Sequence, residues 1–303
     1  VIDNAKVMRQ GGNLIGGTAW FFSRLSHELD TLFVDEAGQV ALANLVACAG
    51  AARNLVLLGD QMQLGQPVQG VHPGQSGDSA LDYLLNGAAT IAPDHGIFLP
   101  TSWRMHPDVC SFISQAVYEG RLHPEPGNAK RTLVLGASAH PALKPSGLGF
   151  LPVQHQGCSQ QSQAEAQLIH QIYNSALQQH YTTTSGQVHP MTVQNILVVA
   201  PYNLQVQLLQ RTLPAGARVG TVDKFQGQEA ELVLMSMTTS SQEDLPRHVE
   251  FLYSKNRLNV ALSRAKCTAL LVASPALLAI KCAKPEEMAL VNTLCWVGEW
   301  AGG

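Results

Sequence analysis

The sequence predicts an α/β fold built mostly on parallel sheets. Short apolar runs recur along the chain, each run ends in a polar or glycine-bearing turn, and helical patterns lie between many of them. Unbroken apolar runs are typical of strands that are buried on both faces, as in parallel sheets. Their alternation with helices favours a doubly wound arrangement.

Each element can be placed from these patterns. The apolar runs predict strands at 14–17, 31–34, 55–58, 97–99, 132–135, 196–200, 219–222, 232–235 and 269–272. Helical periodicity predicts helices at 164–179, 202–213 and 256–266, with one or two more after Ser274. The polar segments 154–163 and 182–190 predict surface loops.

Composition narrows the class of protein. The chain has 303 residues, 46% of them apolar and 14% charged, which suits a packed globular protein of two domains. A net charge of -3 excludes a uniformly basic nucleic-acid coat, although a local basic groove remains compatible with it. The six cysteines form no C-x-x-C pair, which argues against a zinc knuckle or a disulfide framework.

Cellular context and domain organisation follow from what the sequence contains. No apolar run approaches the ~20 residues that cross a bilayer, and no signal peptide is present, so we expect no membrane association and a cytoplasmic protein.

The chain starts at Val1, in the middle of a pattern, which predicts a fragment. A loop at 65–77 and a linker-like segment at 92–96 predict two domains, 1–96 and 97–303.

Two acids follow the expected strand at 31–34. Asp35 and Glu36 stand where ligands bind in open α/β sheets, beyond the carboxyl end of a strand. One carboxylate can hold the water shell of Mg²⁺, and the other can orient or deprotonate an attacking water. We expect Asp35 in the first role and Glu36 in the second. A solvated turn is the alternative.

The next expected strand ends in a similar way. Asp60 follows the run at 55–58 and is expected to contribute to nucleotide binding, and the amide of Gln63 stands three residues further on. Such an amide can sense a phosphate oxygen or the attacking water. Alone the pattern is weak, because Gly-Asp after a strand is a common turn.

Together these segments resemble motifs II and III of superfamily 1 helicases, in the branch of the nonsense-mediated-decay helicase and the replication helicase-nucleases. Bacterial fusions of a RecB-like nuclease with such a helicase look most similar. The likeness covers 16–273 and implies two RecA-like P-loop NTPase domains that use ATP and Mg²⁺. Residues 1–96 would be the C-terminal part of the first domain, and 97–303 the second domain with motifs IV to VI and a tail.

The segment 102–107 resembles motif IV of that family. The resemblance implies that Trp103 stacks on adenine and that Arg104 reaches the terminal phosphates. The family more often has tyrosine at the aromatic position, and tryptophan keeps the stacking face without the hydroxyl. A core tryptophan beside a surface arginine is the alternative.

Motifs V and VI have counterparts further along. The segment 219–229 implies that Thr221 contacts a nucleic-acid phosphate, that Gly227 lets the backbone approach a ligand, and that Glu229 lies on the nucleotide side. The segment 256–266 implies that Arg264 is an arginine finger. Arg257, two helical turns earlier, would share its face and the nucleotide side.

Two further residues carry weaker assignments. Tyr202, in a turn that opens a helix, resembles a position near nucleic acid, although a packed tyrosine explains it nearly as well. Thr18 corresponds to a segment that touches the nucleic-acid backbone, and a buried threonine at a strand end explains it almost as well.

One expected motif is absent from the sequence. A phosphate-binding loop requires G-x-x-x-x-G-K-[ST], and none of the eight lysines precedes a serine or threonine. Truncation at the N-terminus would account for this, and it would leave the first domain with exposed sheet edges.

These observations predict the C-terminal motor portion of an ATP-dependent helicase or translocase acting on single-stranded DNA or RNA, inactive by itself. The alternative is a catalytically inactive module that binds nucleic acid or serves as a scaffold. A nuclease domain elsewhere in the full-length chain is left open.

Overall fold

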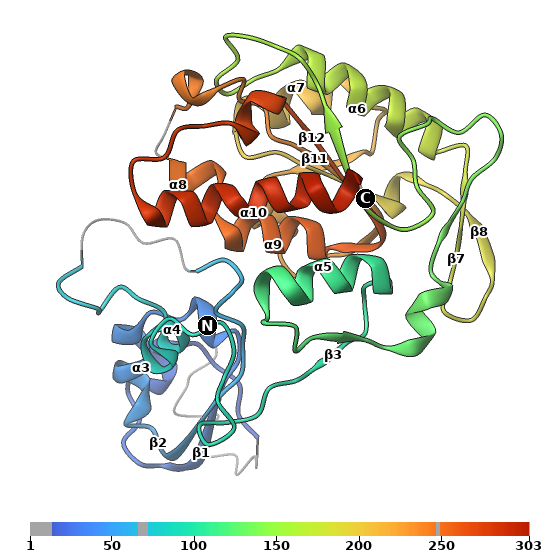
Figure 1. Ribbon diagram of the computed structural model, residues 1–303. Helices are drawn as coiled ribbons and strands as arrows, with labels where there is room; N and C mark the ends of the chain where they lie inside the picture. The colour runs from blue at the N-terminus through green and yellow to red at the C-terminus, as the bar shows by residue number, and fades with distance from the viewer. Residues whose placement is uncertain (1–13, 66–71, 247–248, 303) are drawn as a thin grey trace. The chain divides into compact units, whose positions relative to one another are not determined.

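A computed structural model describes residues 14–65, 72–246 and 249–302. The chain divides into two compact units, Val1–Ile91 and Ala92–Gly303 (Figure 1). The division lies a few residues before the boundary expected from the sequence. That the units are successive motor domains stays a prediction.

The first unit contains two parallel strands joined through a helix. Its elements are α2 (Ala19–Phe22), β1 (Leu29–Val34), α3 (Leu42–Ala49), β2 (Ala52–Leu57) and α4 (Ala80–Leu85). The strands pair in register, with Val34 opposite Leu57. Two expectations were wrong here: 14–17 forms no strand, and Phe33 and Leu55 are 62% and 41% exposed, so these strands are not buried on both faces.

The second unit is organised around a five-stranded parallel sheet in the order β10-β9-β11-β12-β6. The strands are β6 (Gly147–Pro152), β9 (Ile196–Val199), β10 (Arg218–Gly220), β11 (Ala230–Ser236) and β12 (Ala265–Ala273). Every residue of β9 and β11 is buried. The long apolar runs therefore form the centre of the sheet, which confirms the predicted α/β class.

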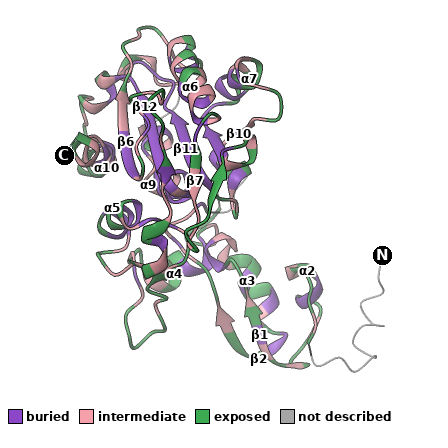
Figure 2. Ribbon diagram, turned by 90° about the vertical axis from the view of Figure 1, so that its right-hand side faces the viewer, coloured by how far each residue is buried: buried purple, intermediate pink, exposed green. Residues whose placement is uncertain are grey.

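Helices cover both faces of this sheet. One layer contains α6 (Gln163–Ala176) and α7 (Asn203–Thr212), and the other contains α5 (Pro107–Val117), α9 (Lys255–Ser263) and α10 (Pro285–Gly302). Ser162 caps α6, and the apolar stripe predicted for this helix packs on the sheet. Figure 2 shows the central strands as buried and the outer surfaces of the helices as exposed.

Smaller elements of this unit depart from the expectations. The run at 97–99 is not a strand, and Ile97 and Leu99 are exposed. The run at 132–135 forms β5 (Leu133–Val134), which is antiparallel to β7 (His180–Thr182) in a small sheet outside the main one. The segment 182–190, expected as a loop, supplies the end of β7 and its partner β8 (Val188–Pro190). The remaining strands and α-helix of this unit are β3 (Thr101–Ser102), β4 (His123–Pro124) and α8 (Val249–Leu252), and short 3₁₀ helices lie between several of the elements.

None of the helices in the described ranges combines the length and the apolar character that a bilayer crossing needs.

Candidate functional site

The two acids of the first unit lie directly beyond β1. The backbone N–H of Glu36 donates to Asp35 Oδ1 at 2.9 Å, and the amide of Gln39 donates to Glu36 Oε2 at 2.9 Å. Both acids are exposed, and Glu36 has a left-handed backbone with φ 52°. The carboxylates are thus held at the strand end while remaining open to a ligand.

The end of β2 lies against this turn. The N–H of Leu58 donates to the carbonyl of Val34 at 2.9 Å, and the N–H of Ala37 donates to the carbonyl of Leu58 at 2.8 Å. A Cβ at Gly38 would stand 2.5 Å from the carbonyl oxygen of Asp60, so only glycine permits this approach. The ends of β1 and β2 therefore lie side by side.

Asp60 positions the amide that was singled out from the sequence. Its Oδ1 accepts the N–H of Met62 at 2.9 Å, and its Oδ2 accepts the side-chain amide of Gln63 at 2.9 Å. In this structure one carboxylate oxygen of Asp60 orients Gln63, and the other accepts a hydrogen bond from the backbone of the turn.

The fit of Mg²⁺ depends on the donors at this edge. Among the described residues, no group of three or more histidine, cysteine or acidic side chains could hold a metal ion. Mg²⁺ in nucleotide sites needs only one or two carboxylates, because waters and phosphate oxygens complete its shell. Asp35 meets that requirement, because its Oδ2 makes no hydrogen bond or ion pair with any described residue.

In the second unit, ion pairs connect Arg104 to the start of β11 and β12. Arg104 Nε lies 3.0 Å from Glu229 Oε2, and Lys266 Nζ lies 2.9 Å from Glu229 Oε1. Lys266 Nζ also lies 3.3 Å from Glu231 Oε1. We name these four residues the ion-pair chain. Arg104 is thereby oriented by the carboxylate that the sequence placed on the nucleotide side.

The electrostatics of the ion-pair chain favour the charged forms. Partial burial alone would raise the pKa of Glu229, but hydrogen bonds from Lys266 and Arg104 outweigh it and hold the pKa below its ordinary value. Burial would lower the pKa of Lys266, but Glu229 and Glu231 raise it above its ordinary value. Both shifts favour the ionised forms of Glu229 and Lys266 at neutral pH.

Trp103 is 73% exposed. The alternative of a core tryptophan is thus wrong, and the ring face is open to a planar ligand.

Gly227 has φ 74°, a backbone conformation that favours glycine, and it lies two residues before Glu229. Thr221 is half-buried at the start of a short 3₁₀ helix that follows β10.

The two arginines of the last motif contact the same segment, between β10 and β11. Arg257 Nη1 lies 3.3 Å from Asp223 Oδ2, and Arg264 Nη1 donates to the carbonyl of Gln228 at 3.4 Å. Asp223 therefore pairs with a cation of α9. Arg264 is only 3% exposed and also donates to the carbonyl of Val260 at 3.2 Å.

The two weaker assignments fare differently. Tyr202 is 5% exposed and stacks on Phe251, with the ring centroids 5.6 Å apart, which favours the packing alternative. Thr18 is exposed and stands at the start of α2, so a buried threonine at a strand end is wrong.

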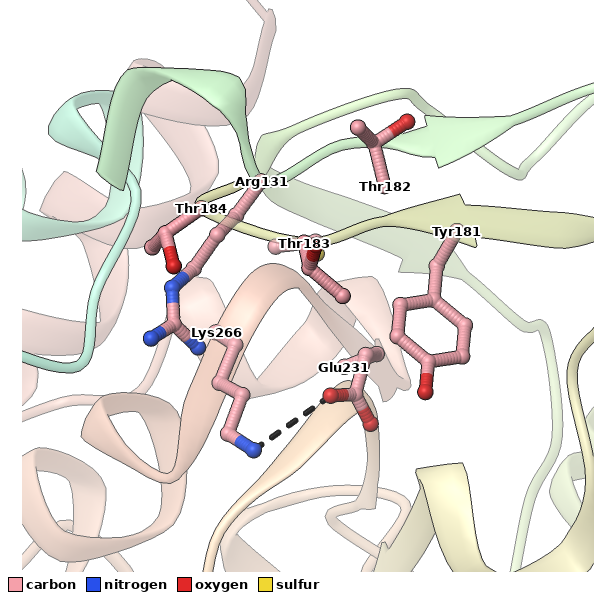
Figure 3. Close-up of a pocket in the computed structure, with 8 residues that line it drawn as sticks. Arg131, Tyr181, Thr182, Thr183, Thr184, Glu231 and Lys266 are labelled. Atoms are coloured by element: carbon pink, nitrogen blue, oxygen red, sulfur yellow. Dashed lines mark hydrogen bonds and ion pairs between the residues drawn. The ribbon is translucent and has the colours of Figure 1, made fainter. Parts of the chain in front are cut away.

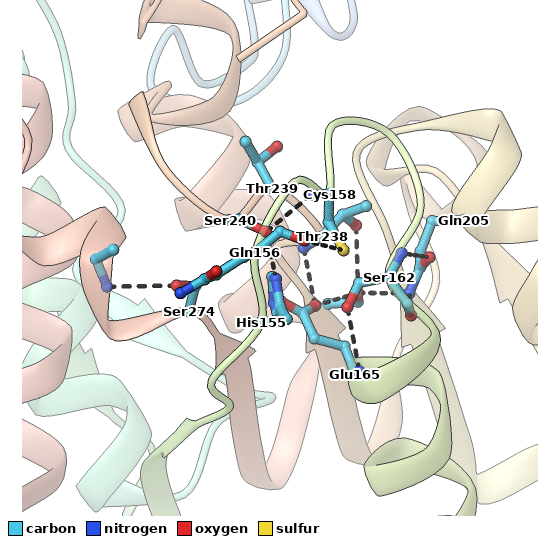
Figure 4. A network of polar contacts seen from close by, with 12 residues as sticks. His155, Gln156, Cys158, Ser162, Glu165, Gln205, Thr238, Thr239, Ser240 and Ser274 are labelled. Atoms are coloured by element: carbon cyan, nitrogen blue, oxygen red, sulfur yellow. Dashed lines mark hydrogen bonds and ion pairs between the residues drawn. The ribbon is translucent and has the colours of Figure 1, made fainter. Parts of the chain in front are cut away.

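A buried polar network at the end of β11 was missed from the sequence (Figure 4). His155 Nδ1 lies 2.7 Å from Ser240 Oγ, and its Nε2 lies 2.9 Å from Glu165 Oε1. Glu165 Oε2 accepts the N–H of Thr238 at 2.8 Å and the hydroxyl of Ser236 at 2.5 Å. Glu165 is fully buried. We name these five residues the buried network.

The loop at 154–163 is anchored through this network. Most of it is exposed, as its polar sequence indicates, but His155 and Ser162 turn inward. The side chain of Gln205 accepts the N–H of Ser162 at 2.8 Å and donates to Ser236 Oγ at 3.0 Å. The chain segment before α6 is thus tied to α7 and to β11.

The roles of Lys266 and Glu231 in the ion-pair chain were also missed from the sequence. Lys266 was expected only as the basic end of a helix, and Glu231 was not singled out.

Comparison with known proteins places this geometry in a family. A family model described as "AAA domain" (AAA_12) matches residues 78–276. The DNA polymerase alpha-associated DNA helicase A of Schizosaccharomyces pombe is 28% identical over 248 residues, which cover 78% of this chain and 36% of that protein. The regulator of nonsense transcripts 1 homolog of Drosophila melanogaster is 29% identical over 265 residues, which cover 84% of this chain and 22% of that protein.

Among solved structures, the complex of Arterivirus nonstructural protein 10 (helicase) with DNA is 17% identical. The structural match covers 88% of this chain and 41% of the helicase chain in that complex, with a TM-score of 0.40. The chain spans 22% to 36% of the length of the two curated relatives named above.

Proposed function

The chain belongs to the AAA-domain family and is a superfamily 1 helicase related to the nonsense-mediated-decay and replication helicases, and from that membership we propose that it is motor machinery that couples ATP hydrolysis to movement along a single nucleic-acid strand. The observation that carries the proposal is the edge of the first unit, where Asp35 and Glu36 follow β1 and where Asp60, which orients Gln63, follows the neighbouring strand β2.

Each of these residues has a role in the proposed reaction. Glu36 accepts a proton from the attacking water, and Gln63 orients that water. Asp35 would hold Mg²⁺, which would neutralise charge on the phosphates. Arg104 and Arg264 neutralise the charge that develops on the transferred phosphoryl group.

The binding roles are divided among the other residues of the proposal. Trp103 stacks on adenine through its exposed face, and Gly227, Glu229 and Arg257 flank the nucleotide. Thr221, Thr18 and Tyr202 are the proposed contacts to the strand. Of these, Tyr202 is the least supported, because its ring is buried.

The test is hydrolysis of ATP by the full-length protein, stimulated in parallel by single-stranded DNA and by single-stranded RNA. We expect Glu36→Gln to abolish turnover and to leave ATP binding intact, because the amide keeps the shape of the side chain and cannot accept the proton. Glu28→Gln is the matched control, since Glu28 is exposed and precedes β1. Turnover at the wild-type rate in Glu36→Gln would refute the assignment of the base.

A further inference from the structure

A hollow of about 240 Å³ lies in the second unit, between the turn after β7 and the first residues of β11 and β12 (Figure 3). Its lining includes Arg131, Lys266, Glu231 and three consecutive threonines, 182–184. None of the residues assigned above to nucleotide or strand lines it. The hollow is smaller than the roughly 300–1,000 Å³ of sites for drug-sized ligands, so it suits a small group.

The hollow carries more positive than negative charge. Its lining has two cations, Arg131 and Lys266, and one carboxylate, Glu231. That carboxylate is already committed, because its Oε1 lies 3.3 Å from Lys266 Nζ and its Oε2 accepts the amide of Asn195 at 2.8 Å. Lys266 is itself shared between Glu231 and Glu229, so the uncompensated positive charge of the lining is that of Arg131.

Arg131 is the cation with donors to spare. Its Nε donates to Asn128 Oδ1 at 3.1 Å, which fixes the direction of the side chain. Within the described ranges, no carboxylate lies within ion-pair distance of its guanidinium, and no residue accepts a hydrogen bond from its two terminal nitrogens. A planar fork of this kind is suited to two oxygens of one anion.

A hydroxyl donor adds to the cations. Thr183 Oγ1 is engaged with Ser185 Oγ at 2.8 Å, whereas the Thr184 hydroxyl makes no hydrogen bond to any residue that the structure describes. Figure 3 shows that Arg131, Lys266 and Thr184 belong to three different segments of the chain, and that the Lys266 ammonium is turned toward Glu231. A phosphate can accept from donors on separate segments, because its oxygens are arranged tetrahedrally, whereas the two oxygens of a carboxylate are coplanar.

We propose that this hollow is a binding site for a phosphate group, held by the fork of Arg131, the hydroxyl of Thr184 and the charge of Lys266. Lys266 links the site to the ion-pair chain, because the same ammonium lies 2.9 Å from Glu229. A phosphate in the hollow draws on that ammonium, while Arg104 remains outside the site. Binding here and binding at the proposed nucleotide site can therefore be separated by mutation.

The experiment titrates inorganic phosphate into the purified protein at constant ionic strength, by calorimetry or by ³¹P NMR. Arg131→Gln should weaken binding at least about tenfold, because it removes charge-assisted hydrogen bonds. Thr184→Ala, on the exposed turn, should weaken it by a smaller factor. Arg211→Gln is the matched control, because Arg211 is an exposed arginine of α7 that does not line the hollow, and it should bind as the wild type does.

Two further arms identify the source of the phosphate and separate this site from the proposed function. Displacement of inorganic phosphate by a short single-stranded oligothymidylate would identify a phosphodiester of a strand, and no displacement would identify a free phosphate or a monoester. Arg104→Gln should leave this binding in place, whether or not the protein hydrolyses ATP. Unchanged affinity in both Arg131→Gln and Thr184→Ala would overturn the proposal.

Discussion

The two ends of β11 both carry a cluster of hydrogen-bonded charges, and the clusters differ in their access to solvent. At its start lies the ion-pair chain, whose side chains are 10% to 43% exposed. At its end lies the buried network, in which the side chains of Glu165 and His155 are 0% and 6% exposed. The strand has seven residues, so the clusters are roughly 20 Å apart.

This difference separates a cluster that can exchange partners from one that cannot. A partly exposed ion pair contributes little to stability, because water replaces a lost partner. A buried carboxylate that loses its partners has no such substitute. We therefore expect changes at the start of β11 to affect function and changes at its end to affect folding.

The largest effect is expected at the buried end. Glu165→Ala removes the acceptor for Thr238, Ser236 and His155 and should lower the free energy of unfolding by about 3–5 kcal/mol. Urea denaturation measures it. Glu299→Ala, in an exposed position of α10, is the control and should change stability little. Equal losses in the two variants would contradict the contrast between the ends.

The opposite pattern is expected at the exposed end. Arg104→Gln should lower ATP turnover of the full-length protein about 10²-fold, as expected when a donor to a developing charge is lost. Its effect on the free energy of unfolding should stay below about 1 kcal/mol, because the Arg104 side chain is 31% exposed. A variant that loses stability and activity together would indicate a structural role, and Arg211→Gln controls for the loss of one positive charge.

The smallest effect is expected from pH. The pKa of Glu229 is lowered in the folded state, so its ion pairs stabilise the fold above the ordinary glutamate pKa of 4.5, and this contribution is lost as the pH falls through the lowered value. The difference in stability between wild type and Glu229→Gln should be less than about 1 kcal/mol at neutral pH, because the side chain is 43% exposed. Urea denaturation over a descending pH series should show it shrinking, and a difference that grows in acid would contradict the ionised pairing.

The sequence indicated the centre of the fold better than its margins. The runs that became β9, β11 and β12 are unbroken and apolar because both faces of those strands are covered. The edge strand β6 was missed, since Gly147, Gly149 and Pro152 are typical of a loop. An edge tolerates them, because one side of the strand needs no ladder hydrogen bonds.

The site was predictable only where a motif has a fixed local geometry. Asp35 and Glu36 stand at a strand end that the apolar run reveals directly. The partners of Arg104 could not be read in the same way, because Glu229 and Lys266 reach it only through the parallel pairing of β11 with β12. His155 was hidden for a similar reason, since it lies in a segment whose composition is that of a solvated loop.

The left-handed backbone at Glu36 means that the residue needed for the proposed chemistry is not the residue that would make this turn most stable to heat. A side chain in that conformation costs on the order of 1 kcal/mol that a glycine would not. Selection for thermal resistance alone would therefore favour losing the carboxylate at this position. A lineage that keeps an acid at this position therefore has a less stable turn and retains the carboxylate that the turn presents.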